Sequence, residues 1–240
     1  MTSHHTAGTL DPGIHTSTSL FTEELFGHLP RADQRRWAHA YLQGLLTTRG
    51  KKSMRRLAAT VSQSRTASQS LQQFINASPW EWDPARQELT RWIERRTDVR
   101  AWTIGCAVLP KRGDHSVGVH RRFVTSAGRV VNCQVGLGLF LATGRGEIPV
   151  DWHLLLRGPW CEDPELRQRA RIPEETGKVP LWLQLGDMVA SLGAHTSLAP
   201  APLVADVSEY TDSAALARAL DGREFVITVP GSLPVLPEGH

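Results

Sequence analysis

The spacing of apolar residues changes at Asp98, and this change constrains the fold more than any other feature of the chain. Before Asp98, apolar residues recur three and four positions apart, as Leu25 and Leu29 or Trp37 and Tyr41 do, which is the period of an amphipathic helix. After Asp98 come three strand-like runs, at 101–109, 115–125 and 129–143. This order predicts an α+β fold, in which a helical domain precedes a mixed β-sheet with flanking helices.

Helices and strands are expected to alternate in the rest of the second half. The pattern predicts a helix at 179–196, a strand at 201–210, a helix at 212–222 and a strand at 223–231. Turns with the sequences PKRGD and SAG separate the first three strands, which we expect to form an antiparallel meander. Between the meander and the first of these helices, a loop around Pro149 and a polar, charged segment are expected.

These patterns divide the chain into three parts. Residues 1–19 are rich in Ser, Thr, His and Gly, without an apolar period, and are expected to form a flexible tail. Residues 20–98 are expected to form a helical, DNA-binding-like domain. Residues 99–240 are expected to hold the sheet.

The helical part carries an outline of a helix-turn-helix. A short helix at 53–61, a turn and a second helix at 68–77 have the required order. Five cations surround this pair and are the candidate DNA-binding residues: Lys51, Lys52, Arg55, Arg56 and Arg65. Two more candidates, Lys111 and Arg112, lie in the turn after the first strand.

Charge is unevenly distributed along the chain. From Arg31 to Phe123 there are 18 Lys and Arg against 7 Asp and Glu, whereas the remaining residues hold 9 against 17. Such asymmetry favours an anionic partner for the first half, most simply double-stranded DNA. A solvated basic face without a partner is the alternative.

Membrane and secretory functions are not expected. The longest apolar stretch, residues 130–142, is interrupted by Asn132 and Gln134 and is too short to span a bilayer. Three cysteines without a CxxC pattern favour a reduced, cytoplasmic protein, which would be associated with the nucleoid if it binds DNA. The sequence leaves open whether the protein forms a homo-oligomer.

Several segments together resemble one known family. They are PKRGDHSVGVHRRF (110–123), AGRVVNCQVGLGLFLA (127–142), PVDWHLLLRGPWCEDPELRQRARIP (149–173) and LVADVSEYTD (203–212). In this order they resemble the core of insertion-sequence transposases of the DDE type, which have a ribonuclease H-like fold. The stretches FTEELFGHLPRADQRRWAHAYLQGLL and LQQFINASPWEWD resemble the N-terminal helical domain of these enzymes, so the resemblance covers roughly residues 20–230.

The resemblance also implies a catalytic site, in which three acids hold two Mg²⁺ ions. Asp206 matches the second acid, whereas Gly105 and Cys106 stand where the family has a pair of aspartates. The third acid would follow the last strand on a later helix, and the chain stops at His240. The sequence therefore predicts a truncated, incomplete core with one remnant acid, no metal site and no bound cofactor.

Three hypotheses about function follow. The first is a catalytically inactive, transposase-derived protein that binds DNA, as a remnant or as a recruited regulator. The second is an enzyme that reuses the former pocket with Cys106, Asp206 and a histidine. The third is a transposase fragment that a partner chain completes. A buried Cys106 and an Asp206 that only caps a loop are the structural alternatives to any chemistry at these two positions.

Overall fold

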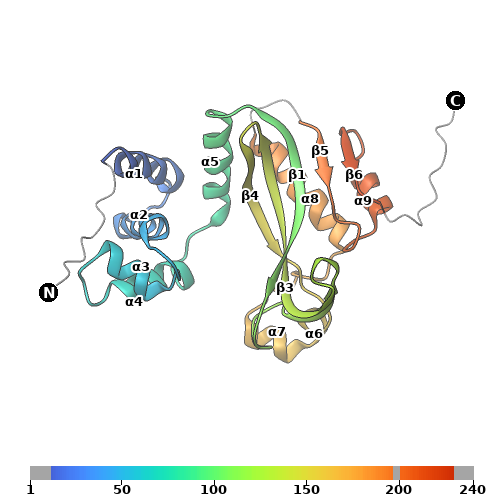
Figure 1. Ribbon diagram of the computed structural model, residues 1–240, viewed down its shortest axis with the longest axis horizontal. Coiled ribbons are helices and arrows are strands. Elements are labelled where there is room, and N and C mark those ends of the chain that lie inside the picture. The colour runs from blue at the N-terminus through green and yellow to red at the C-terminus, as the bar shows by residue number, and fades with distance from the viewer. Residues whose placement is uncertain (1–11, 197–200, 230–240) are drawn as a thin grey trace. The chain divides into compact units, whose positions relative to one another are not determined.

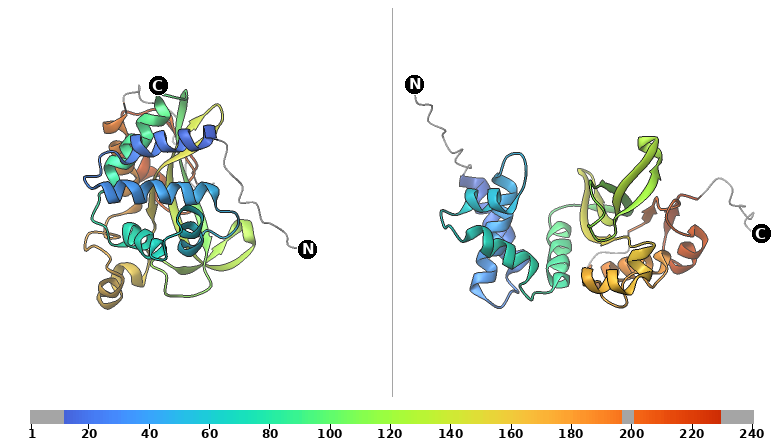
Figure 2. Two further views of the ribbon diagram at one scale, coloured as in Figure 1. Left: turned by 90° about the vertical axis from the view of Figure 1, so that its left-hand side faces the viewer. Right: turned by 90° about the horizontal axis from the view of Figure 1, so that it is seen from below.

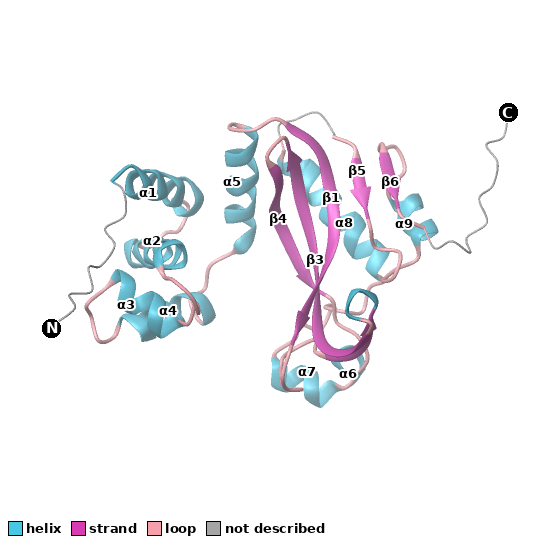
Figure 3. Ribbon diagram, in the orientation of Figure 1, coloured by secondary structure: helices cyan, strands magenta, loops and turns pink. Residues whose placement is uncertain are grey.

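The first 92 residues form a helical unit in the computed structural model, which describes residues 12–196 and 201–229. Figures 1 and 3 show its helices, the last of which reaches into the second unit. They are α1 (Pro12–Phe26), α2 (Ala32–Thr47), α3 (Met54–Val61), α4 (Ala67–Asn76) and α5 (Trp82–Glu94). The second unit comprises residues 93–240, so the division falls six residues before the expected boundary after residue 98.

The expected flexible tail is wrong for residues 12–19, because α1 already begins at Pro12. Proline is well tolerated in the first turn of a helix, where its missing N–H leaves no bond unmade. Further along α1, the Thr22 hydroxyl donates to the carbonyl oxygen of Thr18 over 2.7 Å, so this buried hydroxyl is satisfied within the helix. Residues 1–11 of the expected tail lie outside the described residues.

Helices α3 and α4 pack against α2 around a small apolar core. Its buried members are Leu57, Ala58, Ala67 and Leu71. Gly44 allows α2 to approach α3 closely, because a Cβ at this position would lie 3.2 Å from the Cβ of Leu57. The two short helices expected from the sequence are confirmed, and they enclose a turn at residues 62–66.

The second unit is built on a six-stranded mixed sheet with the order β2-β3-β1-β5-β6, and β4 also pairs with β3. The strands are β1 (Val99–Pro110), β2 (His120–Val124), β3 (Arg129–Thr143), β4 (Gly146–Leu154), β5 (Leu203–Ala205) and β6 (Phe225–Ile227). β1, β3 and β4 pair antiparallel, whereas β5 pairs parallel with both β1 and β6. This arrangement agrees with the predicted α+β class and is consistent with a ribonuclease H-like core.

The expected meander is wrong in its members. The first three strands in sequence do not pair in order, because β2 and β1 both pair with β3. The meander is formed by β1, β3 and β4, and β4 replaces the loop expected around Pro149. Within the described sheet β4 pairs with β3 alone, and an edge strand tolerates a proline because its N–H is not needed for a second ladder.

Helices accompany the sheet in the second unit. They are α6 (Pro159–Glu162), α7 (Pro164–Ala170), α8 (Leu181–His195) and α9 (Ser213–Ala219), together with a short 3₁₀ turn, η1 (Thr125–Ala127). Helices α8 and α9 lie together against one face of the sheet (Figure 2). Leu185 of α8 and Leu216 of α9 are fully buried, as are Leu137 and Leu139 of β3. In the described part of the chain, no helix is long and apolar enough to cross a bilayer.

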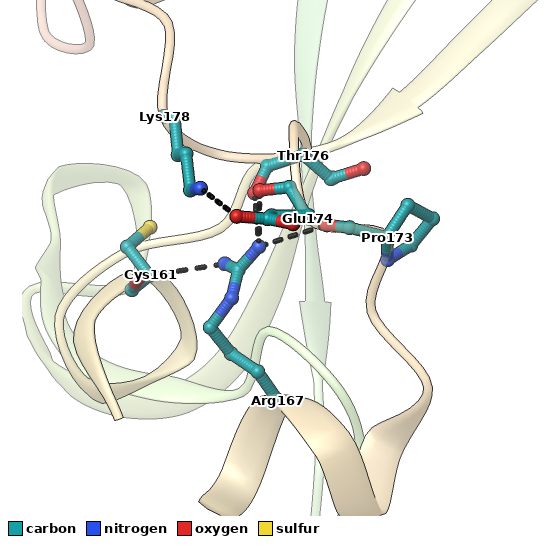
Figure 4. Close-up of polar contacts among 6 residues, drawn as sticks. All are labelled: Cys161, Arg167, Pro173, Glu174, Thr176 and Lys178. Atoms are coloured by element: carbon teal, nitrogen blue, oxygen red, sulfur yellow. Dashed lines mark hydrogen bonds and ion pairs between the residues drawn. The ribbon is translucent and has the colours of Figure 1, made fainter. Parts of the chain in front are cut away.

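A buried arginine organises the segment between β4 and α8 (Figure 4). Arg167 of α7 is 9% exposed, and its guanidinium donates to five backbone carbonyl oxygens over 2.8–3.4 Å. These oxygens belong to Trp160, Cys161, Pro173, Glu174 and Thr176. The WxxDxxxR spacing of this segment is thus structural: Trp160 donates to the Val119 carbonyl over 2.7 Å, and Asp163 caps α7.

We expect Arg167→Lys to destabilise the protein by about 2 kcal/mol or more, because a lysine cannot present a planar fork to carbonyls on two sides. Thermal unfolding followed by circular dichroism measures the change. Arg169→Lys, at an exposed position of the same helix, is the matched control and should change stability by less than about 0.5 kcal/mol. Equal stability of the two variants would contradict the structural role of Arg167.

Candidate functional site

Cys106 and Asp206 come together because β1 and β5 lie side by side. Ile104 of β1 pairs with Ala205 of β5, and the Asp206 N–H donates to the Ile104 carbonyl oxygen over 3.2 Å. Gly105 and Cys106 follow Ile104 directly, so the parallel register brings both positions to the strand end that carries Asp206. The structure thus unites the two residues that the sequence singled out as catalytic candidates.

An open cavity of about 810 Å³ lies over this strand end. Its lining residues are Gly105, Cys106, Val108, Val124, Thr125, Ser126, Asp206, Ser208, Glu209 and Tyr210. They come from β1, from the end of β2 with η1, and from the loop after β5. Hydroxyls and two carboxyl groups make this cavity polar on one side.

The Cys106 thiol is held in its neutral form. Burial of the side chain, together with the nearby Asp206 carboxylate, raises the pKa of Cys106 to about 12. Arg122 and Arg157 oppose this effect only in part. Because the thiolate is the reactive form of cysteine, a thiol with this pKa is a poor nucleophile at neutral pH.

An ion pair crosses the cavity beside Cys106. The Arg122 guanidinium lies 3.3 Å from a Glu209 carboxylate oxygen and stacks over the Tyr210 ring at 4.4 Å from its centroid. The Thr125 hydroxyl donates to the other Glu209 oxygen over 3.2 Å. Arg157 donates to the Tyr210 carbonyl oxygen over 2.7 Å and so anchors the same loop. Glu209 is therefore already engaged by a side-chain cation and a hydroxyl.

The histidines near the basic turn do not join the cavity lining. His115 is exposed in the segment before β2, and the His120 ring nitrogen Nδ1 lies 3.0 Å from the Gly118 carbonyl oxygen. Lys111 continues β1 by donating its N–H to the Asn132 carbonyl oxygen over 2.8 Å, and Arg112 is exposed beside it.

The candidate DNA-binding residues of the helical unit are all exposed. Lys51 and Lys52 lie in the loop before α3, Arg55 and Arg56 on α3, and Arg65 in the turn before α4. The Lys52 ammonium donates to the Leu45 carbonyl oxygen, which fixes it near the end of α2. These side chains surround the α3–α4 pair.

Comparison with known families identifies the chain. The model of the DDE superfamily endonucleases matches residues 24–239. The chain belongs to this family. No curated protein matches it. The resemblance predicted from the sequence is thereby confirmed, and the sheet order agrees with the core expected for such a domain.

The residues of the cavity do not fit the metal ions of a DDE endonuclease. Mg²⁺ takes hard oxygen ligands in near-ideal octahedral geometry, and the neutral Cys106 thiol is not such a ligand. Glu209 is engaged by Arg122, which leaves Asp206 as the remaining carboxylate of the lining. Among the residues that the structure describes, no group of three or more His, Cys, Asp or Glu side chains could hold a metal ion.

Sequence reasoning missed the partners of the ion pair. In the sequence, Arg122 is one of many cations between Arg31 and Phe123, and Glu209 is an acid three residues after Asp206. Arg122 and Glu209 are 87 residues apart and meet only because β2 is placed beside the loop after β5. No local spacing in the sequence indicates such a contact.

We expect Cys106 to resist alkylation. At pH 9 a thiol with the ordinary pKa of 9.0 is half ionised, whereas a pKa of about 12 leaves about one thousandth ionised and should slow the reaction with iodoacetamide by about 500-fold. Mass spectrometry of the labelled peptide measures the rate, with the urea-unfolded chain as control. Asp206→Asn should lower the pKa and accelerate labelling, and a native rate equal to the unfolded rate would contradict the buried, neutral thiol.

Proposed function

We propose that this DDE superfamily protein is catalytically inactive and binds double-stranded DNA through its helical unit. One observation carries the proposal: Gly105 and Cys106, the latter a neutral thiol, occupy the positions on β1, beside the end of β5, where by resemblance to the family a pair of aspartates is expected. The only carboxylate beside them that is not engaged by an arginine is Asp206, among the lining residues of the cavity.

Loss of catalysis follows from what phosphodiester chemistry requires. Two metal ions must stabilise both the attacking and the leaving oxygen of the phosphate. Each ion needs several oxygen ligands, and a single available carboxylate cannot supply them.

The charge of the helical unit supports DNA binding. Residues 34–80 contain eight Lys and Arg and no Asp or Glu. The five cations around α3 and α4 are exposed, so they are available to phosphates. Neutralisation of phosphates by such side chains releases condensed counterions, which drives binding of proteins to duplex DNA. Lys111 and Arg112 of the second unit are further candidates for phosphate contacts.

The alternatives receive less support. A repurposed enzyme with Cys106 as its nucleophile would need a lowered pKa, whereas burial and Asp206 raise it. The histidines that could serve as a base in such an enzyme do not line the cavity. A fragment completed by a partner chain would still lack the first acid on β1, because a partner cannot replace a residue in the middle of a paired strand.

We expect the protein neither to nick nor to join DNA with Mg²⁺ or Mn²⁺. Cys106→Asp should not restore activity, because it adds one carboxylate where the chemistry needs a complete cage. Conversion of a supercoiled plasmid to its nicked form measures the reaction, with Asp206→Ala as the control. Nicking by the parent that Asp206→Ala abolishes would overturn the inactive assignment.

We expect duplex DNA binding to weaken steeply with salt. With four to six phosphate contacts, affinity should fall by about two to three decades between roughly 50 and 200 mM salt, because each contact adds about −0.9 to the slope. Fluorescence anisotropy of a labelled duplex measures the affinity. A variant with all five cations around α3 and α4 changed to Ala should reduce both the affinity and the slope.

The matched control for this variant removes five exposed cations from the second unit. These are Arg100, Arg145, Arg169, Lys178 and Arg218, each changed to Ala. The control lowers the net charge equally, so it corrects for non-specific attraction. Equal loss of affinity in both variants would contradict an interface on the helical unit.

A further inference from the structure

Helix α4 turns an uncharged face of carboxamide side chains to solvent. Gln69, Gln72, Gln73 and Asn76 are all exposed. Gln72 and Gln73 both lie three or four positions from Gln69 and from Asn76, so the four side chains share one side of the helix. The opposite side carries Leu71 and Phe74, which are buried. The sequence of α4, ASQSLQQFIN, contains no charged residue.

This face has donors and acceptors without partners. Each carboxamide offers two N–H donors and a carbonyl acceptor. Among the described residues, none of these four side chains makes a hydrogen bond or ion pair. A helix that only faces water is usually covered by Lys, Glu and other charged residues, often in pairs four apart. The composition of α4 is therefore unlike that of an ordinary solvated face.

Cations lie around this neutral face. Arg65 precedes α4 in the turn, and Arg55 and Arg56 lie on α3, which packs against α4. With no acid at residues 34–80, nothing in this segment would repel a phosphate backbone. The surface thus combines phosphate-binding cations at its border with carboxamides at its centre.

We propose that α4 is the helix that reads bases in the major groove and that its carboxamides select adenine. The proposal rests on the DNA binding proposed above and adds the bases that are read. In a helix-turn-helix, the second helix enters the major groove and contacts base edges. A Gln or Asn side chain there donates to adenine N7 and accepts from the adenine N6 amino group. No other base presents this combination of acceptor and donor in the major groove.

Two other occupants of this face fit less well. A protein partner would need an apolar centre, and the four side chains that form the face of α4 are all polar. A second copy of this chain, docked face to face, would bring Arg55, Arg56 and Arg65 of both copies together, which like charges oppose. Duplex DNA satisfies both the cations and the carboxamides.

The test begins with selection of duplexes from a pool with a randomised centre by the full-length protein. We expect the selected duplexes to share adenines at fixed positions. In the best selected duplex, 7-deazaadenine at these positions removes the N7 acceptor and should weaken binding by the parent. Gln69→Ala, Gln72→Ala and Gln73→Ala should each reduce discrimination against a replaced adenine by about 5- to 150-fold if that side chain makes the bidentate pair.

These variants separate base reading from folding and from phosphate binding. Alanine is the best helix former, so substitution at exposed positions of α4 should not unfold the unit. The salt slope should stay unchanged, because carboxamides release no counterions. Gln168→Ala, at an exposed position of α7, is the matched control and should behave as the parent.

The outcomes are distinct. Failure of the parent to bind any duplex would overturn the proposed DNA binding and this inference with it. Salt-dependent binding without a preferred sequence, or a preference for adenine that survives all three substitutions in α4, would overturn only the role of α4. Loss of discrimination at an unchanged salt slope, together with sensitivity to 7-deazaadenine, supports it.

Discussion

Backbone pairing on both sides of β1 is the constraint on which the second unit depends. Antiparallel bonds tie this strand to β3 along almost its whole length, and parallel bonds tie it to β5. Main-chain groups make both ladders, so a change of side chain at Gly105 or Cys106 removes none of their hydrogen bonds. The pairing places these two residues beside Asp206, and their side chains determine what chemistry this place can support.

Charge gives the two units separate properties. In the second unit, three arginines make internal contacts: Arg167 binds backbone carbonyls, Arg122 binds Glu209, and Arg157 holds the loop of Tyr210. In the helical unit, the cations around α3 and α4 are exposed, and no acid lies in the surrounding segment. Under the function proposed above, binding of a polyanion and any reaction at the cavity would use different residues, so a change at one need not affect the other.

Sequence patterns predicted the long, regular helices and strands, but they did not predict features that depend on contacts between distant parts of the chain. The expected strand at 129–143 agrees with β3, and the helix expected at 53–61 agrees with α3 to within one residue, since each has an apolar pattern that is complete within itself. The strand β4 was missed because Pro149 indicates a loop unless the strand is known to lie at an edge. The strand expected at 115–125 is shorter, since Gly118 adopts a positive φ of 77° in a turn before β2. The meeting of Cys106 with Asp206 was predictable from family resemblance, whereas the Arg122–Glu209 pair arises only from tertiary structure.

The ion pair between Arg122 and Glu209 also bears on how such a protein evolves. In a working site of this kind a diffusible metal ion balances the carboxylates, whereas here a covalently attached guanidinium balances Glu209. A cation that is part of the chain cannot be diluted or chelated, so the loop after β5 no longer depends on the supply of divalent ions. An acid introduced at Cys106 would come near this guanidinium, because the charge of Arg122 already acts on the Cys106 thiol. Under the inactive assignment proposed above, such a carboxylate would compete with Glu209 for Arg122 before it could hold a metal ion.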